Sequence, residues 1–133
     1  QHNCNYCYAR SLLHFRGLWD AAHPRIADIE KVRRKIRSLP SGSIIRLGGM
    51  TDCFQPCELQ YRTTYQTIQE MNLCRVSYLI VTKSALPAAP EYLEILDKEL
   101  AHIQITVTCL DDAQTAQFEK ASPPSQRMMW QSD

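Results

Sequence analysis

The chain begins QHNCNYCYAR, and this stretch places Cys4 and Cys7 two residues apart. A C-x-x-C pair can present two thiolates to one metal ion or cluster, and the same spacing occurs in redox-active disulfides. Zinc normally takes two further ligands, but the next cysteine pair, Cys53 and Cys57 in CFQPC, has one more residue between its members. The residue types therefore indicate metal or thiol chemistry at the start of the chain, and they leave the ligand open.

Composition places this chemistry in an ordinary globular domain. The 133 residues carry 15 basic and 14 acidic side chains, for a formal net charge of +1. This near balance gives no electrostatic support for binding nucleic acid through the bulk surface. No apolar run approaches the ~20 residues that a membrane span needs. We expect a cytoplasmic, reducing compartment, in which Cys74 and Cys109 are buried as small apolar side chains.

The elements that must position the cysteines follow a regular alternation. Three short apolar runs, at residues 43–49, 76–84 and 102–112, are rich in β-branched residues and end in polar ones, which predicts strands. Apolar residues at helical spacing predict helices over residues 25–38, 59–72 and 90–100, and a weaker helix over 112–120. The alternation predicts an α/β fold of repeated βα units with a parallel sheet.

In a sheet of this kind, the loops that follow the strands all emerge at one edge, where α/β proteins carry their active sites. The loops expected there are GGMTDCFQP (48–56), TKS (82–84) and TCLDD (108–112). Each of them is polar. If the opening cysteines follow a further strand ahead of Gln1, they belong to the same edge.

One further cysteine directly ahead of Gln1 would complete the pattern C-x-x-x-C-x-x-C, with an aromatic residue before the last cysteine. With GGMTDCFQP, LIVTKS, ITVT and EKASPPSQR, this stretch resembles the radical S-adenosylmethionine (SAM) superfamily and its spore photoproduct lyase-like subgroup. The resemblance implies a partial (β/α)6 barrel of the TIM type. It also implies that residues 1–133 are part of the radical SAM core domain, truncated at both ends.

The resemblance implies a role for particular residues. Cys4 and Cys7 would ligate a [4Fe-4S] cluster, and Tyr6 would pack near the adenine of SAM. Lys83 would contact the SAM carboxylate. The other cofactor-binding residues that the resemblance implies are Gly48, Gly49, Thr51, Asp52, Thr106 and Thr108.

The activity implied is reductive cleavage of SAM to a 5′-deoxyadenosyl radical that abstracts hydrogen from an unknown substrate, as in a lyase or DNA-repair reaction. A flavodoxin- or ferredoxin-type protein would donate the electron. Cys53 and Tyr8 are candidate catalytic residues, although the lyase's hydrogen-donating cysteine corresponds to the Gly49-Met50 region here. The alternative is a non-catalytic zinc- or thiol-binding α/β module that uses Cys4 and Cys7, with or without Cys53 and Cys57 as further ligands.

Overall fold

The computed structural model describes residues 2, 4, 6–18, 20, 22–23, 25–48 and 51–129. It contains three strands, β1 (Ile44–Leu47), β2 (Ser77–Thr82) and β3 (Ala101–Ile105). The helices are α1 (Tyr8–Phe15), α2 (Ile29–Arg37), α3 (Glu58–Tyr61), α4 (Thr63–Leu73), α5 (Pro90–Ile95), α6 (Asp112–Thr115) and α7 (Pro124–Met128), with a 3-10 turn η1 (Leu86–Ala88).

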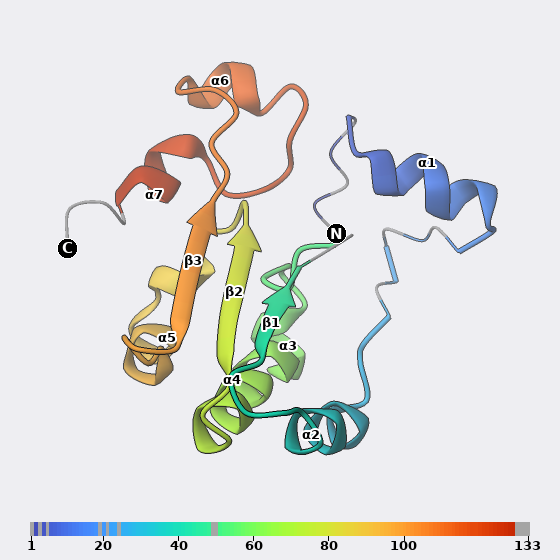
Figure 1. The fold of residues 1–133 in the computed structure, drawn as a ribbon. Helices are drawn as coiled ribbons and strands as arrows, with labels where there is room; N and C mark the ends of the chain where they lie inside the picture. Colours follow the sequence, from blue (N-terminus) through green and yellow to red (C-terminus); the bar gives the residue numbers. More distant parts are fainter. Residues whose placement is uncertain are drawn as a thin grey trace.

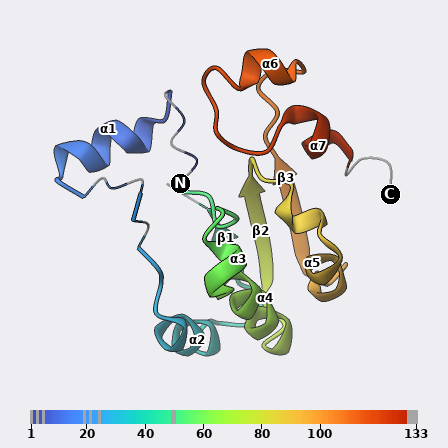
Figure 2. The ribbon, with the colours of Figure 1, turned by 180° about the vertical axis from the view of Figure 1, so that it is seen from behind.

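The strands form one parallel sheet in the order β1-β2-β3. Parallel strands that follow one another in chain order need a crossover connection between each pair, and crossovers of one hand all pass over the same face of the sheet. Helices α3, α4 and α5 accordingly lie behind the sheet in Figure 1 and in front of it in Figure 2. The predicted α/β class and parallel sheet are confirmed.

Alternate residues of the central strand show that one face is covered and the other is open. Tyr78 and Ile80 have no exposed surface, and they pack in the core with Ile68 and Met71 of α4. Between them, Leu79 points to the opposite face and is only half-buried. The core therefore lies between the sheet and the helices.

The open face combines apolar and basic side chains. Arg46 of β1 and His102 of β3 both pair in register with Leu79, so the three residues share this face. Arg46 and His102 are exposed, and Ile44, one pleat before Arg46, is 68% exposed. One face of the sheet is thus available to other parts of a protein or to a ligand.

The helix expected over residues 59–72 is wrong as a single element, because the backbone breaks at Arg62. Arg62 adopts φ 54°, in the left-handed region, and separates α3 from α4. The buried Glu58 carboxylate then accepts hydrogen bonds from the backbone N–H groups of Thr64 and Tyr65 at 2.9 and 2.8 Å. It satisfies the first donors of α4 in place of a side chain at the N-cap position.

Other helix boundaries also differ from the sequence pattern. The helix expected over residues 25–38 is α2, which begins only at Ile29, because the Asp28 side chain accepts from the N–H of Glu30 and caps it there. Helix α5 begins at Pro90 as expected but ends at Ile95, and it buries Tyr92 while Leu93 stays about half exposed. The predicted 112–120 helix is reduced to α6. No helix in the described part of the chain is long and apolar enough to cross a membrane.

Neighbouring residues of β2 test the one-sided core. We expect Ile80→Ala to lower the free energy of unfolding by about 2–5 kcal/mol, because it opens a cavity between the sheet and α4. Leu79→Ala, on the open face, is expected to cost no more than about 1 kcal/mol, because its side chain is already partly in water and no helix in the described part of the chain packs over it. Urea denaturation followed by circular dichroism measures both. Equal losses would contradict an open second face.

Candidate functional site

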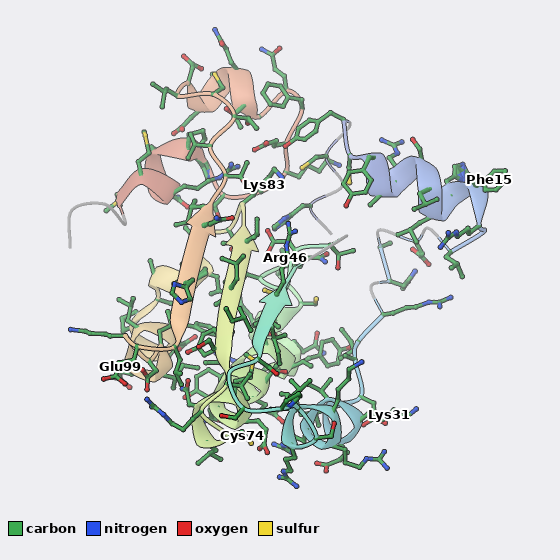
Figure 3. The ribbon with its side chains drawn as sticks, in the orientation of Figure 1. Phe15, Lys31, Arg46, Cys74, Lys83 and Glu99 are labelled. Carbon is green, nitrogen blue, oxygen red and sulfur yellow. The ribbon has the colours of Figure 1, made fainter. Side chains whose placement is uncertain are left out.

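The carboxyl ends of the strands gather most of the residues singled out in the sequence. Figure 3 shows Lys83 at the end of β2, whereas Cys74 lies at the opposite end of the molecule. The chain start and the α6–α7 region lie near the same strand ends in Figure 1. Segments distant in sequence therefore meet at this edge, as the topology requires.

Asp52 joins the loop after β1 to the end of β2. Its carboxylate accepts from the Thr82 hydroxyl at 2.8 and 2.9 Å and from the Lys83 backbone N–H at 2.8 Å. It also accepts from the N–H of Phe54 at 2.9 Å, which closes its own turn. The carboxylate is thus occupied within the protein, and it holds Lys83 in place through the backbone.

Gly48 directly follows β1 and requires glycine for two reasons. Its φ of +85° lies in the left-handed region, and a Cβ there would stand 2.8 Å from the carbonyl oxygen of Val81 in β2. Glycine allows this close approach of two backbones. The contact with Val81 therefore explains glycine at position 48 within the fold, and the implied cofactor-binding role of Gly48 stays a prediction. Gly49 lies outside the described residues.

The two opening cysteines lie in one turn at the start of α1. Cys4 is buried and Cys7 is half-buried, and the N–H of Cys7 donates to the carbonyl of Cys4 at 3.2 Å. Just ahead of them, His2 Nδ1 lies 3.5 Å from an oxygen of Asp52. Burial lowers the pKa of His2, although the Asp52 carboxylate acts in the opposite direction. The cysteine turn therefore lies beside the loop after β1.

Tyr6, between the cysteines, contacts three residues from two other parts of the edge. The Lys83 ammonium lies 5.7 Å from the centre of its ring, and the edge of Phe118 packs on the ring at 5.9 Å between centroids. The Tyr6 hydroxyl donates a short hydrogen bond to Glu119. Burial, followed by this contact with the carboxylate, raises the pKa of Tyr6.

Glu119 and Arg127 form a fully buried ion pair that the sequence analysis missed. Arg127 Nη2 donates to Glu119 Oε2 at 2.5 Å, and both side chains have 0% exposure. The guanidinium also donates to the carbonyl of Thr106 at 2.7 Å, and the Thr108 hydroxyl donates to Glu119 at 2.9 Å. EKASPPSQR places an acid and a base eight residues apart around two prolines, but nothing in that spacing indicates burial.

The threonines implied to bind the cofactor lie beyond strand β3 rather than within it. Thr106 and Thr108 follow Ile105, and Thr106 continues the ladder by donating its N–H to Thr82 at 2.9 Å. The Thr108 hydroxyl is directed to Glu119. Thr51 is exposed in the loop after β1.

The two candidate catalytic residues, Cys53 and Tyr8, lie in different surroundings. Cys53 packs against the hydrophobic core, and burial raises the pKa of its thiol. Tyr8 is the first residue of α1 and is 67% exposed. Within the described residues, the hydrogen bonds to Glu119 come from Tyr6, Thr108 and Arg127 and not from Cys53 or Tyr8. The catalytic roles of Cys53 and Tyr8 stay predictions.

The expected burial of two other cysteines is wrong. Cys74 is exposed at the end of α4, where its thiol lies 3.8 Å from a Glu70 oxygen. Cys109 is half-buried in the loop after β3, with its thiol 3.5 Å from Gln114 Oε1. Each cysteine comes shortly after a partly apolar element, α4 for Cys74 and β3 for Cys109, where the chain has already left the core.

The donors at this edge that the sequence analysis assigned to a metal are the Cys4 and Cys7 thiols. Thiolates suit iron–sulfur clusters and zinc, so the residue types fit either group, but they supply only two ligands. Within the described residues, no three His, Cys, Asp or Glu side chains are grouped so that they could hold a metal ion. Cys53 and Cys57 are thus not gathered with Cys4 and Cys7.

Comparison of this chain with protein-family models, with curated proteins and with solved structures finds no match.

Two glycines with similar backbone angles test the close approach at Gly48. Gly48→Ala and Gly42→Ala both place an alanine at positive φ, +85° and +81°, but only Gly48 faces another backbone within 4 Å. We expect Gly42→Ala to cost about 1 kcal/mol of unfolding free energy and Gly48→Ala to cost about 1–3 kcal/mol more. Thermal and urea unfolding measure the difference. A difference near zero would show that the backbones separate without cost.

Proposed function

We propose that this chain is part of a radical SAM enzyme of the spore photoproduct lyase-like kind. The observation that carries the proposal is the position of the Cys4–Cys7 turn, which lies against the carboxyl ends of the parallel strands beside Lys83. The C-x-x-C pattern alone is compatible with several kinds of thiol site. Its combination with a cation at the end of β2 favours a site for a cluster and an anionic cofactor.

The topology supports the partial (β/α)6 barrel that the proposal requires. In a barrel, parallel strands follow in chain order, helices cover the outer face, and the inner face is free for side chains and ligands. The β1-β2-β3 order, with α4 and α5 on one face, is compatible with such an arrangement. Under this proposal Arg46, Leu79 and His102 line the barrel interior.

Each residue has a role in the proposed site. Cys4 and Cys7 would hold two irons of the cluster, and the third thiolate is the one expected ahead of Gln1. The Lys83 ammonium would pair with the SAM carboxylate, and among the described residues it makes no ion pair with an acidic side chain. Tyr6 would offer its ring to the adenine, and Gly48 would let the cofactor approach the backbone of the loop after β1.

When bound, the cluster would supply the single electron that breaks the S–C5′ bond of SAM into methionine and a 5′-deoxyadenosyl radical. The contribution of this chain is to orient the cofactor and to keep water from the reacting atoms. Thr82 and Asp52 would maintain the position of Lys83, because they fix the backbone at the end of β2. The substrate would be bound on the open face of the sheet, and a one-electron donor protein would reduce the site.

A zinc- or thiol-binding module remains the second candidate, and the arrangement of the cysteines favours it less. In its four-cysteine form, that function would gather Cys53 and Cys57 with the opening pair around one ion. Cys53 instead packs against the core, where burial raises the pKa of its thiol and so disfavours the thiolate that a metal requires.

The cysteines provide the first test. The protein that contains this chain is reconstituted anaerobically with iron and sulfide, reduced with dithionite and supplied with SAM. We expect 5′-deoxyadenosine from the unaltered protein and none from Cys4→Ser or Cys7→Ser, which remove thiolate ligands. The control, Cys74→Ser, changes an exposed thiol at the other end of the molecule and is expected to keep full turnover.

Absence of 5′-deoxyadenosine, together with one tightly bound zinc ion per chain, would reject the enzyme and support the binding module. The codon ahead of Gln1 gives a separate test, because the proposal requires a cysteine there.

Lys83 provides a test of cofactor binding. We expect Lys83→Gln to raise the KM for SAM about tenfold to a hundredfold, because it removes a charged partner of the carboxylate. Iron content should not change, since the lysine does not bind the cluster. Lys98→Gln, exposed near the opposite end of the sheet, is the matched control. An unchanged KM in Lys83→Gln would remove this residue from the cofactor site.

A further inference from the structure

The α6–α7 region is tied to the end of β3 by one buried arginine. Arg127 is 1% exposed, and its Nε donates to the carbonyl of Ser122 at 2.6 Å while Nη1 donates to the carbonyl of Thr106 at 2.7 Å. The Ser122 hydroxyl in turn accepts from the N–H of Ala85, just after β2, at 2.9 Å. These bonds fix residues 119–127 against the ends of β2 and β3.

Glu119 completes this arrangement and is the group that faces the chain start. One carboxylate oxygen accepts from Arg127, and the other accepts from Thr108 and from the Tyr6 hydroxyl. Burial acts to raise the pKa of Glu119, but the hydrogen bonds from Tyr6, Arg127 and Thr108 outweigh it and lower the pKa below its ordinary value. Glu119 is therefore a buried carboxylate, fixed by partners from three parts of the chain.

Tyr6 is the residue through which this carboxylate reaches the cysteine turn. It lies between Cys4 and Cys7, 113 residues from Glu119 along the chain. Its ring is also held by Phe118 and by the Lys83 ammonium, so both its polar and its apolar parts are engaged. Tyr6 is 49% exposed, so these contacts, rather than enclosure in the core, are what can restrain the cysteines on either side.

We propose that Glu119, held by Arg127, is a positioning residue that fixes the Cys4–Cys7 turn on the strand ends through Tyr6, before any ligand binds. Cys4 is 6% exposed in this arrangement, and Cys7 is half-buried. The two thiols are thereby held in one place rather than gathered by the ligand itself. Because the thiols are already ordered, binding a metal or cluster loses less conformational entropy than it would if the ligand had to order them. The inference holds for either candidate function.

The test uses the protein with its thiols reduced and with metal removed by a chelator. It measures how fast iodoacetamide modifies each cysteine under native conditions. Peptide mass spectrometry reports the rate for Cys4, Cys53 and Cys74 separately. We expect Cys74 to react rapidly and Cys4 to be protected. In Tyr6→Phe, which keeps the ring but loses the hydrogen bond to a charged group, the Cys4 rate should rise at least about tenfold.

Cys53 distinguishes positioning from general unfolding, because it packs against the core. The proposal requires its rate to stay unchanged in Tyr6→Phe while that of Cys4 rises. Tyr61→Phe makes the same change at a half-exposed tyrosine of α3 and should leave all three rates unchanged. If Cys4 stays protected in Tyr6→Phe, or if Cys4 and Cys53 accelerate together, the positioning role is rejected.

The rate of Cys4 modification in Glu119→Gln gives a second test of the proposal. This substitution keeps the shape of the side chain and removes the charge that pairs with Arg127, and we expect it to release Cys4 at least as strongly as Tyr6→Phe. Circular dichroism verifies that the variant is folded. A folded Glu119→Gln with Cys4 fully protected would overturn the proposal. None of these measurements uses SAM, so they succeed or fail independently of the proposed radical chemistry.

Discussion

Parallel pairing of three consecutive strands is the constraint on which the rest of this structure depends. Because β1, β2 and β3 run in the same direction and in chain order, every connection must cross back over the sheet, and the connecting helices collect on one face. The same constraint brings the carboxyl ends of all three strands to one edge. The core forms on the covered face, and the polar loops meet at that edge.

Two carboxylates, the partly buried Asp52 and the buried Glu119, organise this edge. Asp52 links the loop after β1 to the end of β2, and Glu119 links the loop after β3 to the chain start. A charge removed from water is costly unless it is paired and hydrogen-bonded, and both carboxylates have several donors. The hydrogen bonds that these carboxylates accept therefore hold the loops in position. Lys83 and the opening cysteines are the groups that the proposed function assigns to ligands.

The regular elements followed from local patterns, and the errors arose where a distant partner decided the outcome. The β-branched runs predicted all three strands, because a strand buried on one face needs such residues wherever it is placed. The interrupted helix at Arg62 was not foreseen, since Glu58 caps α4 from outside it and is itself bound by the hydroxyl of Tyr92, at 2.7 Å, from another helix. Helix α5 similarly buries Tyr92, because its ring packs edge-on against Phe54 and Tyr65 and its hydroxyl donates to Glu58.

The sequence by itself determined the strands, the parallel βα order, and the cysteine spacing that places two thiols in one turn. These features depend on residues close together in the chain, where periodicity and spacing carry the information. Only the tertiary structure decided that Tyr6 meets Glu119 and Lys83 and that Arg127 is buried. Those outcomes depend on contacts between segments many residues apart, and no local pattern contains them.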